Sequence, residues 1–266
     1  TASLEWDGIV SLRLPRVFVA LTVGLALSFS GVALQGLFLN PLCDPYTLGV
    51  SSGAALGAVI ARQTGWIGMS AGAFLGSLCF SGMLFLFSLR QNARGSGLLL
   101  AGVMLGIVGG SILSLWLALM DSQGVSASLG WLLGDFSRAD LRLSLLAFSV
   151  AAGCSAVLYR KSRIFDGFLL GSDGARALGI DVQKERIKII LLTSALVSAA
   201  VIAGGMIGFI GILIPQISRK RWGALHGRLF PISGILGVLV ALGADLAARF
   251  VAAPTEVPVG VLVGLV

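Results

Sequence analysis

Long apolar segments, separated by short polar ones, decide what this chain can fold into. Of its 266 residues, 56% are hydrophobic and 12% are charged, whereas roughly a quarter of the residues in soluble domains are charged. Such a chain has too few polar side chains to cover a soluble core, so the sequence predicts an integral membrane protein. Glycine is abundant, with 37 residues, and favours closely packed helices within lipid.

Eight apolar segments predict an all-α, polytopic transmembrane helical bundle. A helix needs about 20 apolar residues to cross a bilayer. Segment 189–218 is too long for one straight helix, and it contains Gly204, Gly205 and Pro215, so we expect a helix break there. The segments are 17–39, 46–61, 66–89, 95–120, 143–159, 189–218, 229–248 and 257–266.

The distribution of basic residues orients these segments. If the segments alternate across the bilayer, thirteen of the 19 Lys and Arg residues fall on the side that holds the polar stretch 160–188, and six fall on the other. The positive-inside rule therefore places 160–188 in the cytoplasm and the N-terminus outside. We expect a further transmembrane helix to precede an N-terminus placed in this way.

Glycines at four-residue spacing predict tight helix contacts. Such spacing puts small residues on one helix face, where two backbones can approach closely. The sets are Gly49, Gly53 and Gly57; Gly68, Gly72 and Gly76; and Gly102, Gly106 and Gly110.

The sequence lacks the residue sets of several enzyme and ion-coupled classes. His226 is its one histidine, and it contains no GxxxxGK[ST] phosphate loop. We therefore expect no catalytic residue, no metal site and no cofactor bound by this chain. The three cysteines, Cys43, Cys79 and Cys154, share no ligand spacing. The net charge of +7 follows from the positive-inside bias, so nucleic acid is not an expected partner.

Ionisable residues are scarce within the apolar segments, which argues against proton coupling. The expected transport path is wide and mildly polar, with energy supplied from elsewhere. Candidate lining residues are Ser28, Ser30, Gln35 and Ser111.

Seven strings of residues, in order along nearly the whole chain, carry a family resemblance. They are LRLPR (12–16), GVALQGLFLNPLCDPYTLGVSSGAALG (31–57), GLLLAGVMLG (97–106), LGWLLGDF (129–136), LLGSDGARALGI (169–180), GGMIGFIGILIPQISR (204–219) and APTEVPVGVL (253–262). The chain resembles the FecCD-type permeases, the membrane subunits of type II ABC importers for iron-siderophores, haem and cobalamin. The resemblance implies a single permease domain over 1–266 in the bacterial inner membrane. Family members have ten transmembrane helices, and this chain is expected to lack the first and part of the last.

The resemblance implies that the cytoplasmic loop within 160–188 contacts an ATPase subunit. Segment 171–179 suits a short helix that Ser172 or Asp173 caps and Gly179 ends, with Ala175 and Leu178 on one face. A plain solvated loop is the alternative. The ATPase-coupling candidates are Gly171, Asp173, Ala175, Arg176, Leu178 and Gly179.

Two further sites follow from the resemblance. Arg13, Arg16 and Arg249 would receive acidic residues of a substrate-binding protein, the alternative being arginines that extend toward lipid phosphates. Asn40, Leu42, Gly95 and Ser96 would form the cytoplasmic gate, the alternative being an ordinary tight helix connection.

The chain departs from the family pattern at two positions. Gln216 stands where a histidine is usual, and Leu225 precedes His226 where an aspartate is usual.

The expected function is that of a permease subunit that carries a bulky metal chelate, an iron-siderophore or haem. Cobalamin and a molybdate-type oxyanion are alternatives. The expected partners are a pair of ATPase subunits that use ATP and Mg²⁺, a periplasmic or extracellular substrate-binding protein, a second identical or sister permease chain, and lipid. Two rival classes are an ATP-independent transporter or channel and a membrane scaffold that does not transport.

Overall fold

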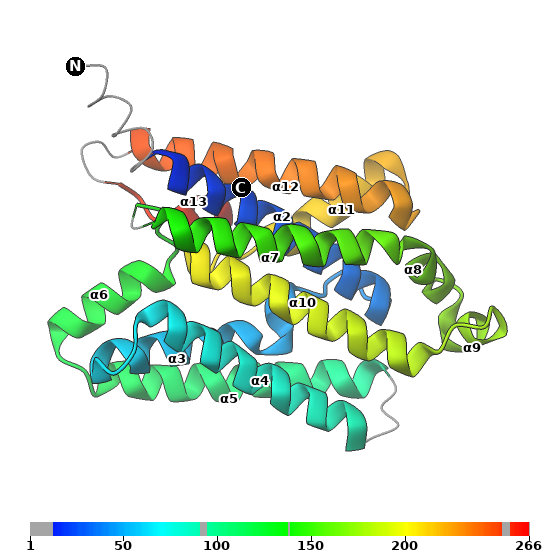
Figure 1. Ribbon diagram of the computed structural model, residues 1–266, viewed down its shortest axis with the longest axis horizontal. Coiled ribbons are helices and arrows are strands. Elements are labelled where there is room, and N and C mark those ends of the chain that lie inside the picture. Colours follow the sequence, from blue (N-terminus) through cyan, green and yellow to red (C-terminus); the bar gives the residue numbers. More distant parts are fainter. Residues whose placement is uncertain (1–12, 91–94, 138, 252–255, 266) are drawn as a thin grey trace.

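The computed structural model describes residues 13–90, 95–137, 139–251 and 256–265, and every regular element in this part of the chain is helical (Figure 1). Six of these helices, α2, α4, α5, α7, α10 and α12, are long and apolar enough to cross a membrane. The prediction of an all-α transmembrane bundle is therefore confirmed. The elements are α2 (Leu14–Phe38), η2 (Pro45–Leu48), α3 (Val50–Thr64), α4 (Met69–Arg90), α5 (Gly95–Ala118), α6 (Ser122–Leu132), α7 (Leu141–Arg160), α8 (Ser162–Phe168), α9 (Gly171–Ala177), α10 (Val182–Gly204), α11 (Ile210–Trp222), α12 (His226–Phe250) and α13 (Val259–Gly264).

Helix boundaries differ from the apolar segments mainly where polar residues continue a helix beyond the apolar stretch. Helix α10 begins at Val182 rather than at residue 189, because Asp181 caps it by accepting a hydrogen bond from the Lys184 amide at 3.1 Å. Helix α6 was not expected at all. Its residues are too polar for a span, and it forms a short helix between α5 and α7 at the end of the bundle opposite α9 (Figure 1).

Helix α2 forms the centre of the bundle, packed against α7, α10, α11 and α12. Glycines on α2 allow two of these contacts. A Cβ added at Gly24 would lie 2.5 Å from the Gly237 carbonyl oxygen of α12, and one added at Gly31 would lie 1.9 Å from the Gly211 carbonyl oxygen of α11. Both distances are too short for any side chain, so the backbones meet directly.

The predicted glycine contacts are confirmed for most members of each set. Gly53 and Gly57 of α3 lie against Gly76 and Gly72 of α4, and Gly49 lies against Gly102 and Gly106 of α5. A Cβ at Gly68 or Gly110 would meet no other atom within 4 Å, so these two glycines mediate no helix contact among the described residues.

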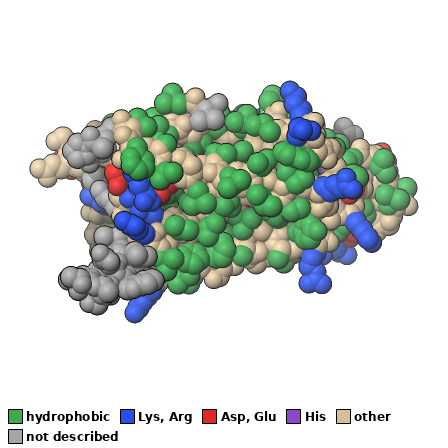
Figure 2. All heavy atoms as spheres, turned by 90° about the horizontal axis from the view of Figure 1, so that it is seen from above, with side chains coloured by type: hydrophobic (Ala, Val, Ile, Leu, Met, Phe, Trp, Pro, Cys, Tyr) green, Lys and Arg blue, Asp and Glu red, His purple; other side chains and the backbone are tan. Residues whose placement is uncertain are grey.

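The surface of the bundle suits a lipid bilayer. Figure 2 shows hydrophobic side chains over the middle of one face, with Lys and Arg side chains gathered at both ends. Large apolar side chains on other helices are exposed as well, for example Leu78 on α4 and Leu146 on α7. The exposed apolar belt is what a membrane-spanning protein requires.

The expected helix break lies after Gly204. Helix α10 ends there, Gly205 has φ 78°, and the backbone stays irregular through Phe209, which has φ 67°. Helix α11 then begins at Ile210.

Pro215 does not break a helix, so that part of the prediction is wrong. It lies inside α11, and its missing N–H leaves the Gly211 carbonyl without its usual helical donor. The Gln35 side chain of α2 compensates, because its Nε2 lies 3.3 Å from the Gly211 oxygen and 3.4 Å from the Ile212 oxygen.

Candidate functional site

Helices α8 and α9 form a projection at one end of the bundle (Figure 1). Helix α8 is anchored by the buried rings of Phe165 and Phe168. Lys161, which precedes α8, has its Nζ 2.5 Å from Glu185 Oε2 on α10. The projection is thus fixed to the spans on either side of it.

Helix α9 ends as the sequence predicted but begins differently. Gly179 has φ 80°, its N–H donates to the Arg176 carbonyl at 2.9 Å, and the Ile180 N–H donates to the Ala175 carbonyl at 3.1 Å. This pair of bonds is a Schellman motif, which favours glycine at the left-handed position. The predicted cap by Ser172 or Asp173 is wrong, because the helix begins at Gly171 and Leu170 precedes it without a side-chain cap.

The exposed face of α9 is not the predicted one. Ala175 is fully buried, so it does not share a free surface with Leu178, which is 62% exposed. Leu170, at 66%, is exposed with it. Arg176 has its Nη1 3.4 Å from Asp173 Oδ1, and both side chains are exposed.

Two of the three predicted docking arginines belong to an ion cluster at the opposite end of the bundle. Arg16 makes two parallel bonds of 2.9 Å to the Glu256 carboxylate, and its Nη2 lies 3.0 Å from Asp245 Oδ1. Arg249 bonds the other oxygen of Asp245, which is buried. The guanidinium of Arg16 is bonded within the chain, and the Arg16 side chain is only 12% exposed. Arg13, by contrast, is exposed, with no ion pair to another described residue.

The cluster makes a pH-dependent contribution to stability. Hydrogen bonds from Arg16 hold the pKa of Glu256 below its ordinary value of 4.5. A lowered folded-state pKa stabilises the fold above the ordinary value, and this stabilisation is lost as the pH falls through the lowered pKa. We expect E256Q to lower the melting temperature by about 1 to 3 °C at pH 7, since Glu256 is partly exposed. The difference from wild type should shrink below pH 4.5, as thermal unfolding in detergent would show; a difference that stays constant down to pH 3.5 would contradict it.

The expected gate residues are only partly described. Asn40 lies in the loop 39–44 between α2 and η2, and its Oδ1 accepts a hydrogen bond from the Leu42 N–H at 3.0 Å. Leu42 is exposed. Gly95 and Ser96 begin α5, but the surroundings of both residues, and residues 91–94 before them, lie outside the described part of the structure. We refer to residues 39–44 as the gate loop.

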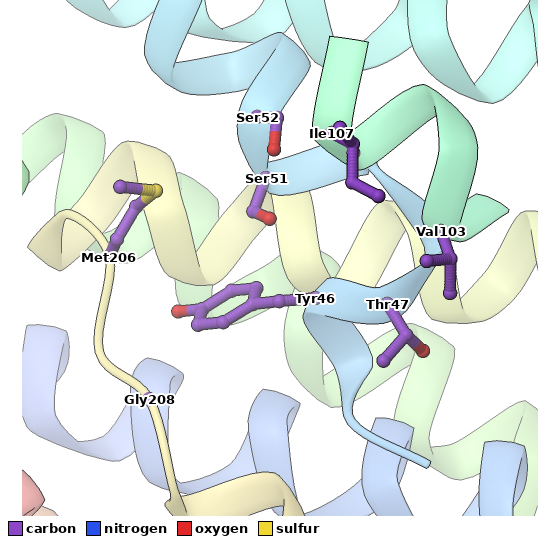
Figure 3. Close-up of a pocket in the computed structure, with 9 residues that line it drawn as sticks. Tyr46, Thr47, Ser51, Ser52, Val103, Ile107, Met206 and Gly208 are labelled. Atoms are coloured by element: carbon purple, nitrogen blue, oxygen red, sulfur yellow. The ribbon is translucent and has the colours of Figure 1, made fainter. Parts of the chain in front are cut away.

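A cavity of about 460 Å³ opens between η2, α3, α5 and the segment after the helix break (Figure 3). In Figure 3 the Tyr46 ring points from η2 toward the backbone near Gly208. Its hydroxyl accepts a hydrogen bond of 2.8 Å from the Ile207 N–H. None of the described residues that line the cavity is charged; they are Tyr46, Thr47, Ser51, Ser52, Val103, Gly106, Ile107, Met206 and Gly208.

The path residues named from the sequence do not line this cavity. Ser28, Ser30 and Gln35 are buried on α2, because that helix occupies the core rather than a channel wall. Ser111 is exposed on α5 but also lies outside the cavity lining. Sequence reasoning missed Tyr46 and Met206, although both stand in quoted motifs. The available signal was a tyrosine directly after Pro45, in a motif that also contains Pro41.

His226 has a structural contact that the sequence did not reveal. Its backbone N–H and its Nδ1 lie 2.9 and 2.8 Å from Asp166 Oδ1, and its ring stacks on Phe165 with the centroids 5.3 Å apart. This link joins the start of α12 to α8. Among the described residues, no group of three metal-ligating side chains is gathered at any position.

Comparisons with known proteins identify membrane transport proteins as relatives, in agreement with the bundle of apolar helices. A model of the FecCD transport family matches residues 1–266. The hemin transport system permease protein HmuU of Yersinia pestis is 36% identical, over 100% of this chain and 82% of that protein. The vitamin B12 import system permease protein BtuC of Vibrio cholerae serotype O1 is 34% identical, over 98% and 80%. The molybdate import system permease protein MolB of Haemophilus influenzae is 34% identical, over 97% and 77%.

Solved structures support the same assignment. An ABC transporter of the metal-chelate type, in an inward-facing conformation, superposes with a TM-score of 0.93 at 32% identity, covering 99% of this chain and 85% of that one. PsaBC of Streptococcus pneumoniae superposes with a TM-score of 0.64 at 15% identity, covering 100% and 92%, and this likeness concerns the fold alone. The chain is a multi-pass membrane protein and belongs to the FecCD transport family.

Proposed function

We propose that this chain is the permease subunit of an ABC importer that carries a bulky metal chelate across the bacterial inner membrane. The observation that carries the proposal is the rigid projection of α8 and α9, which presents exposed Leu170 and Leu178 outside the apolar belt. Exposed leucines at the two ends of a fixed helix suit a groove on a partner protein. That partner would be an ATPase pair, which uses ATP and Mg²⁺.

The cavity supports a chelate as the cargo. Its described lining carries hydroxyl groups, apolar side chains and the Met206 thioether, but no cation to hold a bare oxyanion. A chelate encloses its metal charge and can pass such a wall, whereas a desolvated ion would lack a partner there. An iron-siderophore or haem is the cargo we propose, with cobalamin as the alternative.

The remaining partners complete the importer. A second permease chain, identical or a sister, would close the cavity from its open side. A substrate-binding protein would dock at the end that holds the ion cluster, where the exposed Arg13 offers a donor for its carboxylates. Arg16 and Arg249 would shape this surface through Asp245.

The test of this function is co-purification with the ATPase subunit from the same organism. We expect wild type to retain the ATPase in mild detergent and a variant with residues 171–179 replaced by a flexible linker to lose it. L178D is the gentler variant, because Leu178 is exposed and its replacement leaves the core intact. L119D is the matched control, since Leu119 is 77% exposed at the far end of α5.

The outcomes separate the rival functions. Retention by wild type and L119D, with loss in L178D, supports the importer. No ATPase with any well-folded sample would favour an ATP-independent transporter or a scaffold that does not transport. Uptake of an iron chelate by cells that lack their own permease would then distinguish these two.

A further inference from the structure

Segment 39–48 and segment 205–216 are attached to each other at three points. The Tyr46 hydroxyl accepts from the Ile207 N–H at 2.8 Å. Pro45 packs so closely on Gly211 that a Cβ there would lie 2.3 Å from the proline Cδ. The third attachment lies on the gate loop itself, where Gln216 Nε2 donates to the Pro41 carbonyl at 2.8 Å.

The other backbone hydrogen bonds of the gate loop are local. Asn40 N–H donates to the Gln35 carbonyl and Cys43 N–H to the Asn40 carbonyl, both at 3.2 Å, and Leu42 N–H donates to Asn40 Oδ1 at 3.0 Å. Leu39 ends α2 with φ 51°, a left-handed conformation that a non-glycine residue keeps only when its surroundings impose it. Pro41 has no N–H, and its carbonyl lies beyond the last helical turn of α2. The amide of Gln216 satisfies this carbonyl.

Helix α11, which carries Gln216, is itself bounded by non-helical backbone. The irregular segment 205–209 precedes it, and Gly223, with φ 94°, follows it. Between these ends it is fixed to α2 by Gln35, which bonds the Gly211 carbonyl and accepts from Arg219 Nη1 at 3.1 Å. A displacement of α11 would therefore be passed to whatever Gln216 holds.

We propose that Gln216 is a positioning residue for the inner gate, and that its amide holds the gate loop on α11 so that loop and helix move together. The gate role of the loop rests on the proposed function, whereas the hydrogen bond from Gln216 to the Pro41 carbonyl is seen in the structure itself. The interaction requires a hydrogen-bond donor at position 216, and either a glutamine amide or a histidine imidazole supplies one.

Cys43 gives a direct measure of this attachment. It is a free cysteine within the gate loop and is 1% exposed, with its Sγ 3.7 Å from Thr47 Oγ1. In a background with C79S and C154S, Cys43 is the sole thiol. Its rate of reaction with 4,4′-dithiodipyridine then reports how often the loop opens, and the folded chain alone is sufficient.

We expect Q216M, which keeps the shape but loses the donor, to raise the labelling rate of Cys43 about fivefold, as the loss of one hydrogen bond implies. Q216H should return the rate to within about twofold of wild type, since it restores a donor. Q183M is the matched control, because Gln183 is exposed at the start of α10, and it should label at the wild-type rate.

Q216E adds a pH profile that loss of packing would not produce. Its carboxylate cannot donate at pH 7, so Cys43 should label faster than in wild type, and protonation near an ordinary pKa of about 4.3 should restore the donor. The ratio of its rate to the wild-type rate at the same pH should therefore fall toward one between pH 7 and pH 4.

A wild-type labelling rate in Q216M would overturn the proposal, as would Q216H labelling as fast as Q216M. A flat rate ratio for Q216E would also count against it. These results do not depend on an ATPase, so they remain interpretable if the importer function fails. In liposomes with the full importer, Q216M should lower chelate uptake per ATP hydrolysed relative to Q216H.

Discussion

Replacing Gly31 with valine is expected to prevent the chain from forming its native bundle. The added Cβ would lie 1.9 Å from the Gly211 carbonyl oxygen, and this neighbour is backbone that cannot rotate away. Overpacking a well-packed core costs about 1 to 3 kcal/mol, and more when helices must separate. Because α2 packs mainly against four other helices, α7, α10, α11 and α12, we expect a loss at or above the upper end of that range. The measurement is the monodisperse fraction in mild detergent and the melting temperature.

The matched control for Gly31 is G82V, which introduces the same β-branched side chain into α4. A Cβ at Gly82 would meet nothing within 4 Å, so only helix propensity is affected. G82V should elute as wild type does and melt within a few degrees of it. If G31V behaved like G82V, the direct backbone contact between α2 and α11 would be refuted.

The glycines show which helix contacts the sequence could reveal. Sets at four-residue spacing mark a helix face, and this local pattern predicted that these faces pack closely. The structure pairs α3 with α4, and Gly49 at the end of η2 with α5. Gly24 and Gly31 are seven residues apart, and their partners Gly237 and Gly211 lie far along the chain. No sequence spacing relates Gly24 to Gly237 or Gly31 to Gly211. The central position of α2 could therefore be found only from the three-dimensional structure.

The charged residues also show that sequence patterns do not predict contacts between residues far apart in the chain. Arg16 was expected to be free for a partner, but its carboxylate partner Asp245 is 229 positions away. Near α9, local rules predicted the glycine at its end, because the Schellman motif involves only nearby residues. The burial of Ala175 could not be predicted in that way, since it depends on how α9 packs onto the bundle.

Replacing Gly208 with tryptophan is expected to block transport while leaving the chain folded. Gly208 lines the cavity of about 460 Å³, and a Cβ there would meet nothing within 4 Å. Its φ is not in the left-handed region, so a larger residue is tolerated by the backbone. The indole would occupy the space that a chelate needs, and we expect uptake to fall at least about tenfold, equivalent to roughly 1.4 kcal/mol or more. Radiolabelled iron-chelate uptake in cells would measure it.

The control for Gly208 is G153W, which places the same side chain on an exposed position of α7, away from the cavity. Both variants should bind the ATPase as wild type does, because neither position lies on α8 or α9. Loss of uptake in G208W alone would place the cargo in this cavity. Equal uptake by G208W and G153W would mean that the chelate passes elsewhere, and the uncharged cavity wall would then no longer support a chelate over an oxyanion. Because co-purification of the ATPase is measured on the same variants, a blocked path and a loss of ATPase binding give different results.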